Sequence, residues 1–239
     1  MAHHITKPLM IDLFCGLGGW ASGGLAEGYE VVGFDIERHE CGEHRYPAQL
    51  VLQDVLTLHG SQFKDATLIV ASPPCQEYSY MAMPWKLAKA KAAAIRADTT
   101  GQKLADLNRL FEACFRIAAQ ASLAAGRHIP LVVENVRGAQ KWVGRARWNY
   151  GSFYLWGDVP ALMPPTRDVA KVAGFRFDGS GGSFQSASVK QHGSGAGAEY
   201  LRTEDDKRQH IGVSRKFASA MIAKIPLPLS RHIARCYRP

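Results

Sequence analysis

The sequence predicts an α/β fold, a doubly wound, Rossmann-like mixed sheet with a small irregular region after it. Short apolar runs of strand length alternate with segments of helix length over residues 1–157, and three of these runs are followed by residues that carry chemistry. Alternating strands and helices favour a mostly parallel sheet. Because ligands of such sheets bind beyond the carboxyl ends of the strands, one crevice could hold all three groups of residues.

The predicted strands are the apolar runs at 9–14, 31–36, 50–53, 66–71, 129–134 and 152–156. The clearest predicted helix covers 102–125, where apolar residues recur at near-helical spacing. Shorter helices are predicted at 214–225 and 230–237, with Pro226 and Pro228 breaking the chain between them. Residues 174–198 are rich in glycine and serine and lack periodicity, which predicts loops.

Composition restricts the class of protein. A chain of 239 residues that is 46% hydrophobic can bury one sizeable core and a small appendage. No apolar run approaches the roughly 18 residues of a membrane helix, and the N-terminus has no signal-peptide pattern, so we expect a soluble, cytoplasmic protein. The 5 cysteines are odd in number and include no CxxC pair, so we expect neither a disulfide framework nor a metal site.

The positive charge is concentrated in one stretch of the chain. The net charge of +8 favours a polyanionic partner. Residues 81–150 hold 12 Lys and Arg against 4 Asp and Glu, an excess equal to the whole net charge. This stretch predicts a phosphate-binding surface, with solvated helix faces as the alternative.

The first predicted strand leads into a glycine-rich turn, DLFCGLGG at residues 12–19. Glycines let the backbone turn tightly and approach a ligand closely. Asp35 ends the next strand about 20 residues later, where folds of this kind bind the ribose of a nucleotide cofactor. Asp54 follows the third strand at a similar spacing. This ordered set predicts a site for a cofactor that contains a nucleoside.

Two further strands end in reactive residues. Cys75 lies in the motif SPPCQ, in which two prolines fix the turn after the strand at 66–71. Glu134 and Asn135 end the strand at 129–134. A lone cysteine is usually a small buried hydrophobe. A carboxylate at the end of an apolar strand is costly to bury, however, and this cost favours a functional role for the pair.

In this chain order, the glycine turn, the SPPCQ turn and the Glu-Asn pair resemble the motifs of the DNA cytosine-5 methyltransferases. The resemblance covers residues 9–157 well and the rest thinly. It implies the S-adenosylmethionine-dependent methyltransferase fold, with S-adenosylmethionine as the cofactor. It further implies that Phe14 and Ile36 flank the adenine, that Asp35 binds the ribose hydroxyls and that Asp54 contacts the adenine amino group. The other implied cofactor residues are Asp12, Gly16, Gly18, Gly19, Val55 and Pro73.

The resemblance also implies a covalent mechanism acting on a base flipped out of the duplex. Carbon-5 of cytosine is a poor nucleophile, but a thiolate of Cys75 that adds to carbon-6 gives an enamine whose carbon-5 can attack the methyl group. Glu134 would contact N3 and the amino group of the ring. Asn135 is expected to fix the backbone of the two loops.

Further residues are implied to meet the nucleic acid. Arg145 and Arg147 precede the last predicted strand, where the family has a Gln-x-Arg-x-Arg pattern. The glutamine is missing in this chain, so contact with the base and contact with a phosphate are equally expected. Residues 84–96 correspond to the family's mobile loop, with a solvated basic helix as the alternative. The expected contacts are Gln76, Ser79, Lys86, Lys89, Lys91 and Arg96.

The expected organisation is a cofactor-binding and catalytic domain over 1–157, a reduced target-recognition region over 158–213, and C-terminal helices over 214–239 that pack back on the catalytic domain. The family's C-terminal Gly-Asn-x-Val motif is absent. If Lys224 lies near the place of the missing asparagine, its charge would favour a carboxylated cofactor and transfer of a carboxymethyl group. The alternative is that Lys224 points to solvent.

The predicted function is that of a monomeric DNA cytosine-5 methyltransferase acting on double-stranded DNA. The size suits an orphan enzyme of a phage or mobile element, and a restriction partner is left open. A transfer RNA cytosine-5 methyltransferase is an alternative, because those enzymes share the Pro-Pro-Cys-Gln turn. A catalytically silent DNA-binding homologue is another, against which the intact Cys75 and Glu134 argue.

Overall fold

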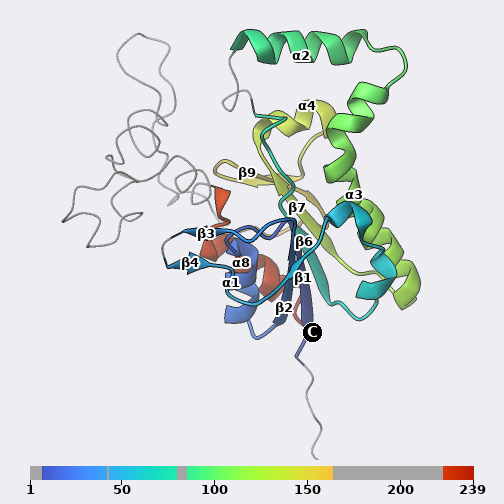
Figure 1. Ribbon diagram of the computed structural model, residues 1–239. Helices are drawn as coiled ribbons and strands as arrows, with labels where there is room; N and C mark the ends of the chain where they lie inside the picture. Colours follow the sequence, from blue (N-terminus) through green and yellow to red (C-terminus); the bar gives the residue numbers. More distant parts are fainter. Residues whose placement is uncertain (1–6, 42, 80–84, 164–222) are drawn as a thin grey trace, which may run out of the picture. The chain divides into compact units, whose positions relative to one another are not determined.

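Figure 1 shows the computed structural model, which describes residues 7–41, 43–79, 85–163 and 223–239. The chain divides into two compact units. The first contains residues 1–40, 45–164 and 225–239, and it includes the main sheet and the helices that cover it. The second contains residues 41–44 and 165–224, of which 41, 43, 44, 223 and 224 are described.

A seven-stranded mixed sheet forms the centre of the first unit. Its strands follow the order β5 (Gln49–Leu52), β2 (Glu30–Asp35), β1 (Leu9–Leu13), β6 (Leu68–Ala71), β7 (Leu131–Asn135), β9 (Phe153–Gly157) and β8 (Trp148–Tyr150). Strands β5 to β7 run parallel, whereas β9 is antiparallel to both of its neighbours. The chain builds outward from β1 in one direction through β2 and β5, and in the other from β6. The predicted doubly wound, Rossmann-like mixed sheet is therefore confirmed.

All the strands predicted from apolar runs are present, with ends displaced by at most two residues. Three strands were not predicted. The short β3 (Glu40–Cys41) and β4 (His44–Arg45) form a two-stranded sheet of their own, and neither contains an apolar run. Strand β8 is only three residues long, too short to show a period.

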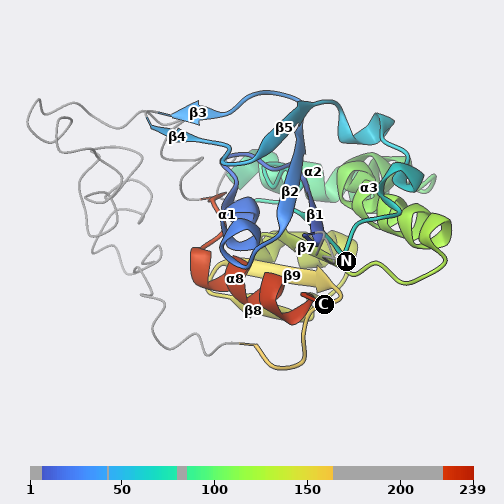
Figure 2. The same ribbon diagram turned by 90° about the horizontal axis from the view of Figure 1, so that it is seen from below.

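The two faces of the sheet are covered by different helices (Figure 2). Side chains alternate along a strand, so Met10 and Ile11 of β1 point to opposite faces. Helix α1 (Gly19–Ala26) packs on the face of Met10, which lies where a side chain on Gly24 would be. Helix α8 (Leu227–Cys236) packs beside α1. Helix α3 (Gln102–Ala125) and the 3-10 turns η1 (Val55–Thr57) and η2 (Gly60–Phe63) cover the other face.

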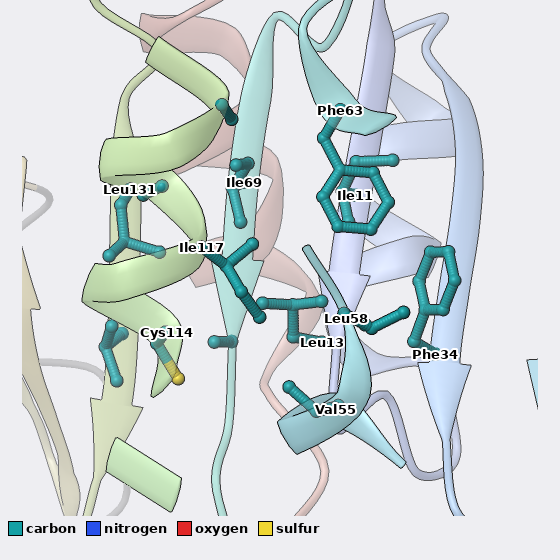
Figure 3. Close-up of a cluster of buried hydrophobic side chains, with 14 of the residues drawn as sticks. Ile11, Leu13, Phe34, Val55, Leu58, Phe63, Ile69, Cys114, Ile117 and Leu131 are labelled. Carbon is teal, nitrogen blue, oxygen red and sulfur yellow. The ribbon is translucent and has the colours of Figure 1, made fainter. Parts of the chain in front are cut away.

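The main hydrophobic core lies between the sheet and α3 (Figure 3). Its sheet residues include Ile11, Leu13, Ile69 and Leu131, and Cys114 and Ile117 come from α3. Phe34 of β2 packs edge-on against Phe63, with ring centroids 5.2 Å apart. Burying side chains of this size stabilises the fold by about 1.5–3 kcal/mol each.

Helix α3 occupies the predicted range, between Gly101 and Gly126. Gly126 has φ 64°, the left-handed conformation that commonly ends a helix, and glycine adopts it without a Cβ clash. The remaining helical segments are α2 (Trp85–Ala97), η3 (Arg137–Ala139) and α4 (Gln140–Val143). Residues 84–96 were expected as a mobile loop or a basic helix, and α2 is a helix over nearly that range.

The position of Pro228 was predicted wrongly. Helix α8 begins at Leu227, so Pro228 lies in its first turn instead of separating two segments. Backbone N–H groups of a first turn have no intrahelical acceptor, so a proline there loses no hydrogen bond. The helix predicted at 214–225 and the loops predicted at 174–198 fall almost entirely outside the described residues, as does most of the expected recognition region at 158–213. The domain boundaries stay predictions.

Within the described ranges, no helix is long and apolar enough to cross a membrane. The same part of the chain contains no group of three or more His, Cys, Asp or Glu residues placed to hold a metal ion.

Helices α1 and α8 are joined by an ion-pair cluster around Glu27, which directly follows α1. Arg231 Nε lies 2.8 Å from Glu27 Oε1, and Arg235 Nη2 lies 2.9 Å from the same oxygen. The hydrogen bonds from Arg235 and Arg231 lower the pKa of Glu27 to about 2. The C-terminal helix is therefore attached through a carboxylate that must stay ionised.

This cluster predicts a loss of stability in acid. The folded pKa of Glu27 is depressed, so its contribution is complete above the ordinary glutamate pKa near 4.5 and is lost as the pH falls toward 2. Glu27→Gln should lower the unfolding midpoint at pH 7, and the difference from the parent should shrink between pH 5 and pH 2. Thermal unfolding across a pH series measures this difference. Glu30→Gln, at an exposed position on β2, is the control and should behave as the parent. A difference for Glu27→Gln that stays constant with pH would contradict the assignment.

Candidate functional site

The candidate site lies at the carboxyl edge of the sheet, where the strand order changes direction between β1 and β6. In doubly wound sheets, this switch point opens a crevice between the loops that leave the two strands. The glycine turn follows β1 and the SPPCQ turn follows β6. The sheet thus brings together the residues that the sequence predicted for cofactor and nucleophile.

The glycine turn has a strained backbone. Phe14 has φ 55°, and it is the one residue other than glycine with positive φ in the described part of the chain. This conformation costs a non-glycine residue about 1–2 kcal/mol. It is held by hydrogen bonds from Cys15 N to Phe34 O (3.2 Å) and from Gly18 N to Cys15 O (2.8 Å). A Cβ built on Gly16 would meet no atom within 4 Å, so the turn leaves open space beside its backbone.

Two acids flank this turn, on β2 and after β5. Asp35 is buried, and its Oδ2 accepts a hydrogen bond of 2.9 Å from Gly16 N, which ties the acid to the turn. The next residue, Ile36, is 73% exposed, unusual for an isoleucine. Asp54 is half-buried, and its Oδ1 accepts from Leu56 N at 2.9 Å. Because β5, β2 and β1 are neighbours, the predicted cofactor residues line one edge of the sheet.

Asp12 and Val55 were also predicted at the cofactor, but both side chains are buried in protein. Asp12 has no exposed surface, and burial raises the pKa of its carboxyl well above the usual value. The hydroxyl of Tyr46 donates to Asp12 Oδ2 at 3.3 Å. Gly33 makes room for the Tyr46 ring, since a Cβ there would lie 2.3 Å from Tyr46 Cζ. Asp12 is thus a buried partner of Tyr46, and Val55 belongs to the core.

The turn that carries Cys75, the predicted nucleophile, is here called the nucleophile turn; it is fixed by its own backbone and by one tyrosine. The N–H groups of Tyr78 and Ser79 both donate to the carbonyl of Cys75, at 3.1 and 2.9 Å. The buried Tyr78 hydroxyl lies 3.1 Å from Leu107 O and 3.1 Å from Asn108 Oδ1, and shares its proton between them. Asn108 in turn donates to the carbonyl of Trp142. The cysteine turn is therefore attached to α3 and, through it, to α4.

Asn135 joins the acid strand to the nucleophile turn. Its Nδ2 donates to the carbonyl of Pro73 at 2.9 Å, and its Oδ1 accepts from Val136 N at 2.8 Å. The expected role of Asn135, fixing the backbone of two loops, is confirmed. Pro73 is itself buried, so the turn is held from both sides.

Glu134 lies at the end of β7 and is only 8% exposed. Burial raises the pKa of its carboxyl to about 8, and a hydrogen bond from Ser72 opposes the rise. A carboxyl group with this pKa is mostly protonated at pH 7 and can donate a proton. Its side chain is therefore suited to act as a neutral acid beside a reacting ring.

Arg145 and Arg147 are both exposed and precede β8. Arg147 N donates to Leu155 O, and Leu155 of β9 is the register partner of Glu134. The Arg147 backbone therefore lies two strand spacings, roughly 10 Å, from the acid. This distance is within reach of a long side chain, and the choice between base and phosphate stays open.

The predicted nucleic-acid contacts fall into two groups. Lys86, Lys89 and Arg96 are exposed on α2, and Gln76 is exposed on the nucleophile turn, while Ser79 is half-buried. Lys91 forms an ion pair with Glu77, two residues after the nucleophile. The basic helix is thus connected directly to the Cys75 turn.

Sequence reasoning missed the residues that support the site. Tyr46, Tyr78, Asn108, Trp20 and Ser72 all act through contacts with elements distant in the sequence. Asn108 alone gave a local signal, because it is a polar residue on the buried face of an amphipathic helix. Lys224, expected near the cofactor or at solvent, is half-buried and belongs to the second unit, so its role stays a prediction.

The family comparison supports the motif assignment. Residues 9–94 match the model of the family described as C-5 cytosine-specific DNA methylase. This segment contains the glycine turn, Asp35, Asp54 and the Cys75 turn. The resemblance drawn from these motifs is confirmed. Among curated proteins, none matches the chain.

Several solved structures are similar to part of the chain. One is described as a DNA modification methyltransferase encoded within a prophage of E. coli, with 23% identity over 56% of this chain and 33% of that chain and a TM-score of 0.36. Another is the Dnmt2 methyltransferase of S. pombe (15% identity, 58% and 37%, TM-score 0.35). A third is the Entamoeba histolytica methyltransferase EhMeth (16% identity, 58% and 41%, TM-score 0.33). The chain spans roughly a third to two fifths of these proteins.

The tyrosine that anchors the nucleophile turn predicts a specific loss of stability. Tyr78→Phe keeps the ring but leaves the buried Asn108 amide oxygen without its donor, while the Leu107 carbonyl keeps its helical hydrogen bond within α3. Leaving this buried acceptor unsatisfied should cost about 1–3 kcal/mol of unfolding free energy, measured by urea denaturation. The control is Tyr154→Phe, since the Tyr154 hydroxyl makes no hydrogen bond within the described residues. Equal stabilities of the two variants would mean that the Tyr78 hydroxyl does not anchor the turn.

Proposed function

We propose that this chain, whose residues 9–94 match the C-5 cytosine-specific DNA methylase family, is an S-adenosylmethionine-dependent DNA cytosine-5 methyltransferase. The family match supports a cytosine methyltransferase. The observation that supports the finer proposal is the hydrogen bond from Asn135 to the Pro73 carbonyl, because it ties the strand that carries Glu134 to the turn that carries Cys75. A nucleophile and a neutral acid side by side are what this chemistry requires.

The residues around the glycine turn fit the proposed cofactor. The open space at Gly16 suits close approach of a ligand to the backbone. Asp35 can accept from ribose hydroxyls with the lone pairs that Gly16 N–H leaves free, and the exposed Ile36 offers an apolar surface for adenine. Asp54 keeps Oδ2 for the adenine amino group while Oδ1 caps η1. When bound, S-adenosylmethionine supplies a methyl group on a sulfonium centre.

The chain's own residues then account for the addition to the ring and for the proton at N3. The Cys75 thiolate forms a bond to carbon-6 of a flipped cytosine, and the electron pair of the 5,6 double bond moves to carbon-5. Glu134, protonated because burial raises its pKa to about 8, gives its proton to N3 as charge develops there. With the cofactor bound, carbon-5 would take its methyl group and leave a thioether behind. A base would then remove the carbon-5 proton, and the electron pair of that C–H bond would re-form the 5,6 double bond as the carbon–sulfur bond breaks. This step returns the Cys75 thiolate, and Glu134 recovers its proton from N3.

The substrate is proposed to be double-stranded DNA, bound by a monomer. Supporting this, the exposed cations of α2 follow the nucleophile directly in the chain, and Lys91 touches its turn through Glu77. Recognition of the DNA sequence is proposed for 158–213. Transfer RNA and catalytic silence remain the competing hypotheses, and one experiment separates them.

The covalent step predicts the behaviour of Cys75 variants. Cys75→Ala should abolish methylation while leaving cofactor and DNA binding near the parent level, because only the carbon–sulfur bond is lost. The parent should form a denaturation-resistant adduct with duplex DNA that carries 5-fluorocytosine, since fluorine cannot leave carbon-5 as a proton does. Gel analysis of the adduct and transfer of labelled methyl groups provide the measurements.

The matched control is Cys236→Ala, an exposed cysteine at the end of α8, which should form the adduct normally. Methyl transfer to transfer RNA in place of duplex DNA would establish the RNA substrate. Binding of DNA with no transfer to either would support the silent homologue. Methylation by Cys75→Ala above a trace rate would overturn the covalent mechanism.

The cofactor assignment predicts a change in affinity at Asp35. Asp35→Ala removes a buried acceptor from the ribose and from Gly16 N–H, so S-adenosylmethionine should bind more weakly by about 1–3 kcal/mol, or about 5–150-fold in Kd. Calorimetry on the free protein measures the Kd. Asp65→Ala, at an exposed turn before β6, serves as the control and should leave it unchanged. An unchanged Kd in Asp35→Ala would place the cofactor elsewhere.

A further inference from the structure

A chain of hydrogen bonds leads from the glycine turn to the proposed acid. Trp20, in the first turn of α1, donates its indole Nε1–H to Ser72 Oγ at 3.0 Å. The register of β6 and β7 places Ser72 beside Glu134, and its hydroxyl acts as a hydrogen-bond donor that lowers the pKa of the Glu134 carboxyl. Trp20 is 2% exposed and Glu134 is 8% exposed, so water has little access to either end.

The pleat of the sheet places these groups on one face. Ala71 of β6 is paired in register with Val133 of β7, so the next residues, Ser72 and Glu134, are side by side. Ala71 and Val133 both belong to the core on the α3 side. Because side chains alternate, Ser72 and Glu134 point to the opposite side, which is the side of α1 and Trp20.

The donors in this chain can be assigned from chemistry alone. An indole N–H donates and never accepts, so Ser72 Oγ must be the acceptor in its bond with Trp20. The single hydroxyl proton of Ser72 is then left for the Glu134 carboxyl. A hydroxyl that accepts one hydrogen bond donates a stronger one, and its rotation is fixed. Ser72 therefore meets Glu134 as an oriented donor.

We propose that Trp20 and Ser72 are positioning residues that set the orientation and the ionisation of Glu134. The inference rests on the proposed function insofar as Glu134 is taken as the acid of the reaction. A donor to the carboxylate stabilises the ionised form, so this pair counteracts the effect of burial and keeps the acid able to give up its proton near neutral pH.

The pair also connects two parts of the site. Trp20 follows Gly18 and Gly19 directly, and these glycines belong to the turn proposed to hold the cofactor. A displacement of the first turn of α1 moves the indole N–H away from Ser72 and weakens the donor to Glu134. The ionisation of the acid therefore depends on the conformation of the cofactor turn.

The first test measures the acid without any reaction. Carbon-13 NMR of glutamate side chains, with the Glu134 signal assigned by its loss in Glu134→Gln, gives the pKa of Glu134 in the free protein. Ser72→Ala should raise this pKa by about 0.4–1 unit, the worth of one ordinary hydrogen bond. Trp20→Phe should raise it by less, and the double variant by no more than Ser72→Ala. Trp148→Phe, on β8, is the control and should not shift it.

The second test uses the pH dependence of methyl transfer. A reaction that needs protonated Glu134 loses rate as the pH rises through its pKa, so the alkaline limb of kcat/KM should move to higher pH in Ser72→Ala and, less, in Trp20→Phe. A merely structural role would lower the rate at every pH and leave the limb in place. Unshifted titrations in both variants, or additive shifts in the double variant, would overturn the pairing. If NMR shows the shifts but the parent transfers no methyl group, the pairing stands and the proposed function fails.

Discussion

The need to satisfy buried polar groups at the carboxyl edge of the sheet determines the rest of this structure. Asp12, Asp35, Glu134 and Asn135 all end parallel strands and are at most 8% exposed. A buried polar group without a partner costs several kcal/mol, and an unpaired charge costs more. Each of these side chains makes at least one hydrogen bond with a residue outside its own strand, although Asp12 Oδ1 has no partner among the described residues. The hydrogen bonds that these side chains make hold the loops of the site in place.

The partners come from distant parts of the chain, which makes the site a product of the whole fold. The hydrogen-bond partner of Asn135 is Pro73, 62 positions earlier in the sequence. Tyr46 donates to Asp12, 34 positions earlier, and Tyr78 donates to Asn108, 30 positions later. Such bonds join elements distant in the sequence, so the site is held by several elements at once. The turn that carries Cys75 is therefore held firmly, which suits the proposed role of Cys75 because catalysis depends on placement to within a fraction of an ångström.

The sequence was sufficient for the strands and for the order of the motifs, because both are local patterns. Apolar runs mark the parallel strands whatever they pack against, and the glycine turn and SPPCQ are contiguous. The supporting residues could not be predicted in this way. In the sequence, Trp20 is only an aromatic residue of a helix and Ser72 only a serine of a turn. Their hydrogen bond depends on the pairing of strands that are distant in the sequence. Pro228 was placed wrongly because a proline that breaks a helix and one that begins a helix look alike without knowledge of where the helix begins.

The contacts around Cys75 differ in strength: the turn itself is held by buried hydrogen bonds, whereas the basic helix α2 is held to it by an ion pair with an exposed partner. The nucleophile turn is held by buried hydrogen bonds from Tyr78 to Asn108 and from Asn135 to Pro73, each of which is costly to break. The basic helix α2 is held to the same turn by the pair of Lys91 and Glu77, and the Glu77 side chain is 62% exposed. Exposed pairs contribute about 0–1 kcal/mol, so a phosphate can displace Glu77 from Lys91 at little cost. The positive surface can therefore adjust to its partner while the nucleophile keeps its place.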